Sequence, residues 1–146
     1  MSVLVIAEHD NLNLKTFSLN AINAASKIDA DIHVLVAGNK CENVSKEAAA
    51  VLLVKKVLQS ESTNYANYLA ENLTPLIVKL AEKYTHIIAS ANTFGKNFMP
   101  RVAALLDTSQ VSDIIKLIAQ IILFDLFMLE THLQQLKAMI KKNVLR

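Results

Sequence analysis

Glycine is scarce in this sequence, because Gly38 and Gly95 are the only two glycines among 146 residues. Dinucleotide-binding loops and P-loops need several closely spaced glycines, since their backbone must approach a phosphate. Both motifs are therefore excluded. We retain one weaker candidate, a strand-to-helix turn whose backbone N–H groups and one ammonium would face an anion. Gly95 could equally serve only a tight turn. The residues of this candidate are Thr93, Gly95, Lys96 and Asn97.

Cysteine and closely spaced histidines are lacking as well. Cys41 is the only cysteine, so the chain can form neither an internal disulfide nor a thiolate metal cluster. We expect Cys41 to be buried as a small hydrophobic residue in a protein of a reducing compartment. The histidines are too widely spaced for a helical metal site, and we predict none. They are His9, His33, His86 and His132.

No part of the chain has the charge pattern of a nucleic-acid-binding protein. The net charge of +2 comes from 15 basic and 13 acidic residues, which are scattered apart from a small basic end. The amino terminus enters an apolar run at once, without a basic targeting segment. A later apolar stretch, residues 114–129, contains charged residues and is short for a membrane span. We expect a cytoplasmic protein with no nucleic-acid partner and no transmembrane segment.

The periodicity of the chain is that of an α/β protein with one core. Hydrophobic residues make up 53% of the sequence, and short apolar runs alternate with longer amphipathic segments. This pattern predicts a three-layer αβα fold with a mostly parallel sheet. We expect strands at residues 3–7, 32–37, 51–58, 86–90 and 111–116, and helices at residues 14–27, 42–50, 62–83 and 97–106. The core face of the first helix is expected to carry Phe17, Ala21, Ala24 and Ala25.

Both prolines fall within or beside predicted helices. Pro75 either kinks the third helix or begins a further helix capped by Thr74, and we favour one bent helix. Arg101 follows Pro100 at the predicted start of the fourth helix. A fixed guanidinium near a surface commonly forms a bidentate pair across an interface. The sequence leaves open whether the partner of Arg101 lies within the chain.

Right-handed crossovers place the loops that follow parallel strands along one edge of the sheet. These loops read EHDN, AGNKC and ASANTFGKN, and any binding is expected there. Within EHDN, His9 and Asp10 could contact a nucleotide or form an acid–base pair. No serine or cysteine nucleophile on a recognisable elbow accompanies them. We therefore identify no catalytic residue and favour a role for both in shaping the loop beside Asn11.

Five segments of the chain form an ordered set without large gaps. They are VLVIAEHDN (3–11), HVLVAG (33–38) with Cys41 shortly after, YTHIIAS (84–90), GKNFMPRVAALLD (95–107) and SDIIK (112–116). Together they resemble the amino-terminal domain of the electron-transfer flavoprotein alpha subunit. The resemblance covers residues 1–117, and its most specific part is GKN-x-x-PR-x-A-x-LLD.

The resemblance implies an electron-carrier subunit rather than an enzyme. In that family an alpha subunit pairs with a beta subunit, and the heterodimer carries electrons on FAD from acyl-CoA dehydrogenases of fatty-acid β-oxidation and related dehydrogenases to a membrane quinone oxidoreductase. FAD is held chiefly by a carboxyl-terminal domain of the alpha subunit. No position in residues 1–146 matches the FAD motif of the family, so no flavin-binding residue is assigned. What remains resembles an adenine-nucleotide alpha-hydrolase-like, Rossmann-like module that serves as scaffold and subunit interface.

The chain departs from the family pattern after Lys116, where the family would continue into Arg-Pro-Ile-Tyr-Ala-Gly-Asn-Ala. Codons permitted by residues 124–138 can encode RPIYAGNAFATVKS in the neighbouring frame, which contains this missing motif. We therefore interpret residues 118–146 as a frameshifted tail that leaves the sheet incomplete, with the break between Lys116 and Gln120. As a helix the tail would be amphipathic, and we predict it to be helical. Its apolar positions would be Leu126, Leu129, Leu133, Leu136 and Ile140.

Two functions remain open from the sequence. The first is a truncated electron-transfer flavoprotein alpha subunit that cannot hold FAD alone. The second is a stand-alone adenine-nucleotide-binding or regulatory module that uses EHDN and ANTFGKN. A flavin absorbance band or measurable nucleotide binding distinguishes these possibilities.

Overall fold

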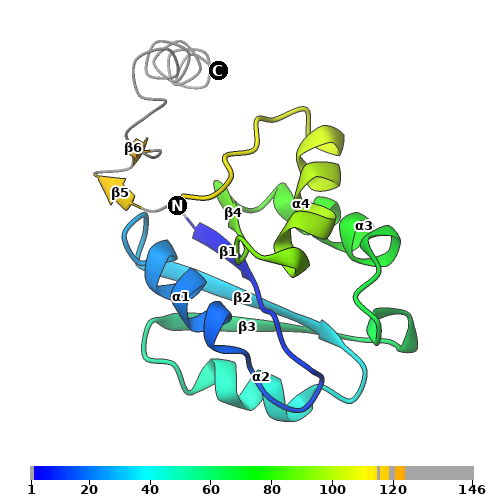
Figure 1. Ribbon diagram of the computed structural model, residues 1–146. Helices are drawn as coiled ribbons and strands as arrows, with labels where there is room; N and C mark the ends of the chain where they lie inside the picture. The colour runs from blue at the N-terminus through cyan, green and yellow to red at the C-terminus, as the bar shows by residue number, and fades with distance from the viewer. Residues whose placement is uncertain (1, 115, 119–120, 124–146) are drawn as a thin grey trace. The chain divides into compact units, whose positions relative to one another are not determined.

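The main unit of the protein is built on a four-stranded parallel sheet (Figure 1). A computed structural model describes residues 2–114, 116–118 and 121–123, and the chain divides into two compact units after Ser112. The strands have the order β3-β2-β1-β4, and each neighbouring pair is parallel. Their bounds are Ser2–Ile6 for β1, Asp31–Gly38 for β2, Val54–Glu61 for β3 and His86–Ile88 for β4.

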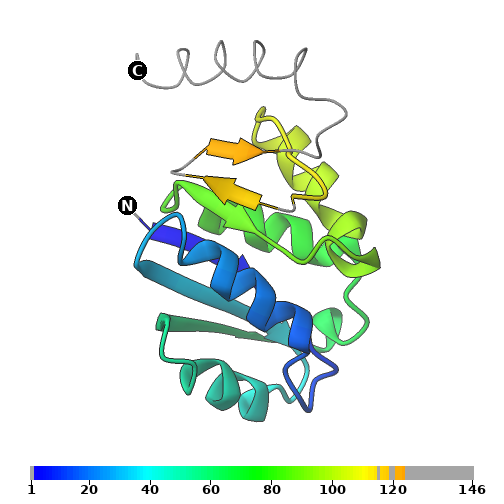
Figure 2. The same cartoon turned by 60° about the vertical axis from the view of Figure 1, so that its left-hand side comes forward.

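Helices cover both faces of this sheet. The helices α1 (Thr16–Ala25) and α2 (Glu42–Ala49) pack on one face, and α3 (Ala70–Ala81) and α4 (Thr93–Leu105) pack on the other. Figure 2 shows α1 lying across the front of the sheet. The predicted three-layer α/β arrangement is therefore confirmed. No helix in the described part of the chain is long and apolar enough to cross a bilayer.

Strand β1 forms the centre of both cores. Val3 and Val5 face α1 and α2, whereas Leu4 and Ile6 face α3 and α4. None of the four is more than 2% exposed. Successive side chains of a strand point to opposite faces, so a strand buried on both faces must be a continuous apolar run. This explains why the run VLVI could be recognised from the sequence as a buried strand.

The core face of α1 is confirmed at Ala21 and Ala25, but Ala24 is only partly buried and Phe17 is misplaced. Phe17 is 55% exposed, and the buried residues of the helix are Ser18, Ala21, Ile22 and Ala25. The hydroxyl of Ser18 accepts a hydrogen bond from the Glu8 backbone N–H (2.7 Å) and donates one to the Glu8 carbonyl (2.9 Å). This pair of bonds directs Ser18 inward, and it turns the neighbouring Phe17 toward solvent.

The start of α4 was predicted four residues too late. The helix begins at Thr93 because the Asn92 side chain accepts hydrogen bonds from the backbone N–H groups of Phe94 and Gly95, which is an N-cap. Pro100 consequently lies inside α4 rather than at its start.

The region predicted as the third helix is divided in the structure. Residues Thr63–Tyr65 form a short 3₁₀ turn, and α3 begins only at Ala70. Pro75 lies inside α3, so no further helix begins there, and Thr74 is buried within the helix. Strand β3 begins at Val54, later than predicted, because the residues after α2 first complete a turn in which the Val54 N–H donates to the Val51 carbonyl.

The second unit contains a short antiparallel pair of strands. β5 (Lys116–Ile118) pairs with β6 (Ile121–Leu123) in a separate two-stranded sheet. The predicted strand at residues 111–116 is therefore wrong for residues 111–114, and the predicted helical tail is wrong at residues 118 and 121–123. Two short segments this close in the chain can pair locally, with a small loop-closure cost. The rest of the predicted tail, residues 124–146, lies outside the described residues.

Two phenylalanines provide a matched test of this packing. Phe98 is fully buried in the core beneath α3 and α4, whereas Phe17 is exposed. Phe98→Ala is expected to lower the free energy of unfolding by about 3–5 kcal/mol because it leaves a cavity. Phe17→Ala is expected to lower it by less than about 1 kcal/mol. Urea unfolding followed by circular dichroism measures both, and equal losses would contradict the exposed position of Phe17.

Candidate functional site

The loops that follow β1, β2 and β4 lie at the same edge of the sheet, as predicted, because these strands are parallel. The chain runs from β1 through β2 to β3 and then returns to the other side of β1 to form β4. The direction of strand addition therefore reverses between β1 and β4. Open α/β sheets bind ligands outside the carboxyl ends of their strands at such a point. Residues 8–15 and 89–92 are thus the natural place for a site.

The Glu8 carboxylate connects the loop after β1 to the loop after β4. The Glu8 Oε2 atom accepts hydrogen bonds from the Ser90 hydroxyl (3.0 Å) and from the Asn92 side-chain amide (2.6 Å). The Asn92 Oδ1 atom in turn accepts from the first backbone N–H groups of α4. Glu8 therefore joins the end of β1 to the amino-terminal cap of α4.

The predicted anion site is not favoured by this geometry. The backbone N–H groups of Gly95 and Lys96 donate to the Asn92 side chain and to the Asn92 carbonyl (2.9 Å). The side-chain amide of Asn97 donates to the Tyr68 carbonyl (3.3 Å). A phosphate at this helix end would compete with the cap and would lie near the Glu8 carboxylate. These internal contacts count against the predicted anion site, which stays a prediction.

Gly95 has a steric role instead. A Cβ atom at this position would lie 2.0 Å from the Ser90 carbonyl oxygen, which is backbone and cannot rotate away. Neither glycine has a φ in the left-handed region. The absence of a side chain therefore allows α4 to approach the loop after β4 closely, and this packing alone accounts for a glycine at this position.

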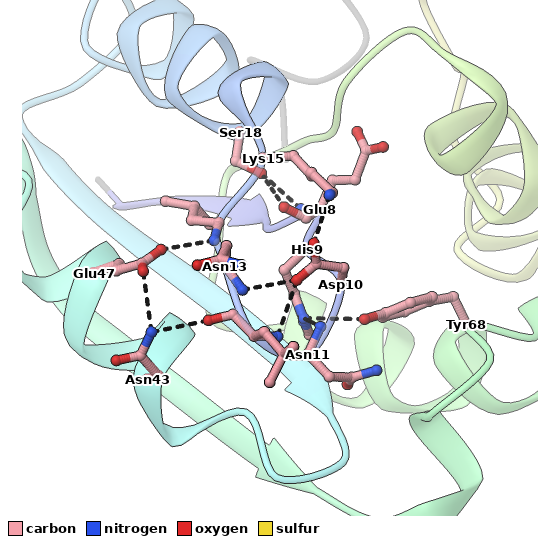
Figure 3. Close-up of polar contacts among 12 residues, drawn as sticks. Glu8, His9, Asp10, Asn11, Asn13, Lys15, Ser18, Asn43, Glu47 and Tyr68 are labelled. Carbon is pink, nitrogen blue, oxygen red and sulfur yellow. Dashed lines mark hydrogen bonds and ion pairs between the residues drawn. The ribbon is translucent and has the colours of Figure 1, made fainter.

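His9 is buried beside Tyr68 at this edge (Figure 3). Its Nδ1 atom accepts a hydrogen bond from the Asn11 backbone N–H (3.1 Å), and the Tyr68 hydroxyl lies 3.1 Å from the same atom. Since a backbone N–H can only donate, the neutral ring carries its proton on Nε2. Among the described residues, Nε2 has no hydrogen-bond partner of good geometry.

Burial shifts the pKa values of this pair in opposite directions. Burial lowers the pKa of His9, and the Ala37 carbonyl and the Asp10 charge offset this only in part. Burial also raises the pKa of Tyr68 to about 12. Both side chains are consequently neutral near pH 7, and the geometry supports a structural role.

Asp10 shapes the loop, as favoured from the sequence. Its Oδ1 atom accepts hydrogen bonds from the backbone N–H groups of Leu12 (3.0 Å) and Asn13 (2.8 Å), which forms an Asx turn. Its Oδ2 atom pairs with the Lys15 ammonium at 2.6 Å. The Lys15 side chain and these backbone donors lower the pKa of Asp10. The carboxylate is thus committed to contacts within its own loop.

Helix α2 holds the same loop from the side (Figure 3). The Glu47 Oε2 atom accepts a hydrogen bond from the Leu14 backbone N–H (2.7 Å), and the Asn43 side-chain amide donates to the Leu12 carbonyl (2.9 Å). Asn43 also donates to Glu47 within the helix. These two side chains attach residues 12–14 to the helix that follows β2.

Asn11 connects three segments, and sequence reasoning assigned it no such role. Its backbone has a φ of 69°, and its Oδ1 atom accepts from the Asn39 backbone N–H (2.8 Å). Its amide donates to the Ala66 carbonyl (3.3 Å). Asparagine tolerates the left-handed region, which is a local signal for a turn. The partners were not readable because they lie 28 and 55 residues away.

Arg101, the other polar residue considered from the sequence, lies on α4 and contacts α3. The Arg101 guanidinium pairs with the Glu71 carboxylate at 2.8 Å, so it has a partner within the chain. This pair lies beside a cavity of about 350 Å³ between α3 and α4. Glu71 has a lowered pKa, first through its own backbone N–H and then through Arg101.

The predicted burial of Cys41 is confirmed, and burial raises the pKa of its thiol. His33 contacts the Tyr84 hydroxyl (2.8 Å), and His86 contacts Thr85 (3.0 Å). His132 lies outside the described residues. Within the part of the chain that the structure describes, no three His, Cys, Asp or Glu residues are placed to hold a metal ion.

The close approach at Gly95 is directly testable. Gly95→Ala is expected to lower the free energy of unfolding by about 1–3 kcal/mol through overpacking, although alanine in a helix is intrinsically preferred to glycine by about 1 kcal/mol. Thr93→Ala on the same helix is the control, since Thr93 is exposed, and a change within about 0.5 kcal/mol is expected. Thermal and urea unfolding measure both variants. Stabilisation by Gly95→Ala would contradict the proposed contact with Ser90.

Comparison with known proteins identifies the family. The profile of the electron transfer flavoprotein domain matches residues 3–128, past the boundary expected after residue 117. Electron transfer flavoprotein subunit alpha of Pseudomonas aeruginosa is 50% identical over 119 residues, which are 82% of this chain and 38% of that subunit. The corresponding subunit of Bradyrhizobium diazoefficiens gives the same identity and coverage.

A mitochondrial relative shows the same partial coverage. Electron transfer flavoprotein subunit alpha of Dictyostelium discoideum is 48% identical over 121 residues, which are 77% of this chain and 34% of that subunit. The chain thus spans about a third of the length of the curated relatives it matches. It belongs to the electron transfer flavoprotein domain family, and over these residues it is a homologue of the amino-terminal part of the alpha subunits.

Proposed function

We propose that this chain supplies the amino-terminal domain of an electron transfer flavoprotein alpha subunit and acts as scaffold and subunit contact. One observation carries the proposal: 119 residues of the chain are 50% identical to a region that makes up only 38% of the Pseudomonas aeruginosa subunit. The chain would therefore contribute the amino-terminal part of an electron-carrier subunit.

In this proposal the flavin is held chiefly by the part of the alpha subunit that lies beyond the matched region. The complete heterodimer with a beta subunit would carry electrons on FAD from acyl-CoA and other dehydrogenases to a membrane quinone oxidoreductase, and the chain would act in the cytoplasm. The carboxyl edge of the sheet supports the scaffold role. Its helix N-terminus is capped by Asn92, and a carboxylate, Glu8, lies beside that cap.

A stand-alone adenine-nucleotide-binding or regulatory module is the second candidate. The reversal of strand order between β1 and β4 supports it, because ligands of α/β proteins bind at such points. The internal contacts of Glu8 and Asn92 count against it, since they use the groups that a phosphate would need. Binding of AMP or ATP to the purified chain, measured by calorimetry, is the observation that would favour this candidate.

A domain exchange tests the scaffold role. Residues 1–117 of this chain replace the matching region of the Pseudomonas aeruginosa alpha subunit, and the hybrid is produced with the beta subunit of that organism. We expect a hybrid that co-purifies with the beta subunit, holds flavin and is reduced by an acyl-CoA dehydrogenase, because the exchanged domain contributes no flavin contact. The unaltered heterodimer is the positive control. A stable hybrid that pairs but loses its flavin would contradict the assignment of this domain to the scaffold.

The proposed frameshift makes a prediction about the gene. The coding sequence for residues 116–138 is the informative region, because it contains the proposed break and the codons of the out-of-frame motif. It also overlaps the end of the family match at residue 128. We expect the neighbouring frame there to encode RPIYAGNAFATVKS. Sequencing the gene and its transcript across this region is sufficient, and absence of these codons from the adjacent frame would reject the frameshift.

A further inference from the structure

One buried imidazole joins three segments at the carboxyl edge of the sheet. His9 lies in the loop after β1, is 3% exposed and accepts the Asn11 backbone N–H at Nδ1. Tyr68, in the segment before α3, contacts the same atom through its hydroxyl and packs edge-on against the ring, with centroids 5.2 Å apart. Figure 3 shows Asn11 and Tyr68 converging on His9 from different segments.

The end of β2 and the loop after it pack closely against His9 and Asn11. A Cβ atom at Gly38 would lie 2.4 Å from Asn11 Oδ1 and 2.6 Å from the Cε1 atom of His9. The Asn39 backbone N–H donates to that same Asn11 oxygen. The position of the His9–Asn11 pair therefore determines how the loop after β2 is held.

The backbone in these segments needs such support. Asn11, Lys40 and Tyr68 have φ values of 69°, 54° and 53°, one in each of the three segments. Non-glycine residues in the left-handed region persist only where surrounding contacts hold them. Loss of the central contacts should therefore release all three segments rather than one.

The hydrogen bonds at His9 are compatible only with the neutral ring. A proton on Nδ1 would face the Asn11 N–H, so that two donors would point at each other. The Nε2–H group already lacks a partner of good geometry within the described residues, and the ring is shielded from water. Protonation therefore removes the bond to Asn11 and places a positive charge on a ring that is shielded from water.

We propose that His9 is an acid-sensitive lock, in which protonation of the ring breaks its contact with Asn11 and releases residues 9–13 from residues 39–41 and 66–69 while the sheet stays folded. The lock is a property of this domain and extends beyond its proposed role as scaffold. It does not depend on pairing with a beta subunit or on a bound flavin.

The charges around His9 act in opposite directions. Asp10, in the same loop, favours the protonated ring, but burial has the larger effect and lowers the pKa of His9. The neighbouring segments contribute Tyr68, whose pKa is raised, and Cys41 just before α2, whose pKa is also raised by burial and by Glu61. Tyr68 and Cys41 carry no charge near or below neutral pH. The charged residues of these segments are Lys40 and Glu61, and the Lys40 backbone N–H donates to the Glu61 carboxylate (3.0 Å).

The direction of the pH dependence follows from the lowered pKa. The released segments bind a proton to His9 near its ordinary pKa of about 6.5, whereas the locked segments bind it only at lower pH. The lock is therefore fully stable above about pH 6.5 and weakens as the pH falls below it. Until the locked state also takes up the proton, each further pH unit lowers the ratio of locked to released molecules about tenfold.

Hydrogen exchange of the full chain, read by NMR between pH 7 and pH 4.5, tests the proposal. Protection factors correct for the intrinsic pH dependence of exchange. We expect protection of the Asn11 and Asn39 amides to fall about tenfold per pH unit below pH 6.5, while the amides of β1 stay protected. Loss of protection in all strands at once, or unchanged protection at Asn39, would overturn the lock.

Variants show whether His9 or a nearby carboxylate causes the pH transition. In His9→Gln, protection at Asn39 should no longer change over this pH range, whereas Asp10→Asn and Glu47→Gln should keep the transition. Tyr68→Phe retains the imidazole but removes the hydroxyl that contacts Nδ1, so the transition should remain but its midpoint pH should change. This variant also serves if His9→Gln fails to fold. A transition that persists in His9→Gln, or one that is lost in Glu47→Gln, would assign the effect to a carboxylate and reject the proposal.

Discussion

Burial of β1 on both faces is the constraint on which the rest of the main unit depends. Val3, Leu4, Val5 and Ile6 are at most 2% exposed, so their backbone groups are shielded from water and need partners on both sides. Parallel pairing with β2 and β4 satisfies them. Because both faces of the sheet are apolar, helices must cover both of them. The same pairing brings the end of β1 to the position where the strand order reverses.

The residues at the carboxyl ends of β1 and β4 contact one another. Glu8 binds Ser90 and Asn92, Asn92 caps α4, and Asn11 connects the loops after β1 and β2. A ligand-binding crevice of this fold class would present such donors and acceptors to a phosphate or ribose. Here the polar groups are used to join strands and loops. This use agrees with a scaffold domain in a family whose curated alpha subunits are about three times longer than the matched region.

The parallel sheet was predictable because its strands are continuous apolar runs, and the run VLVI needs no tertiary context to be recognised. Boundaries that depend on a side-chain contact were less predictable. The start of α4 was missed although Asn92 is a common capping residue, because Pro100 offered a stronger apparent signal. The inward face of α1 was misplaced because Ser18, a polar residue, is buried by its bonds to Glu8. Pairing between residues 116–118 and 121–123 was missed because short, mostly apolar segments suit helix and strand equally.

The sequence by itself determined the family, the parallel α/β core and the exclusion of glycine-rich phosphate loops, because each of these depends on residue types or on short-range periodicity. It also indicated that Asp10 shapes a loop, since an Asx turn involves only neighbours. Only the tertiary structure decided the contacts of the candidate site. Tyr68 lies 59 residues from His9, and Ser90 lies 82 residues from Glu8. Such pairs meet only after the strands have assembled, so no local pattern records them.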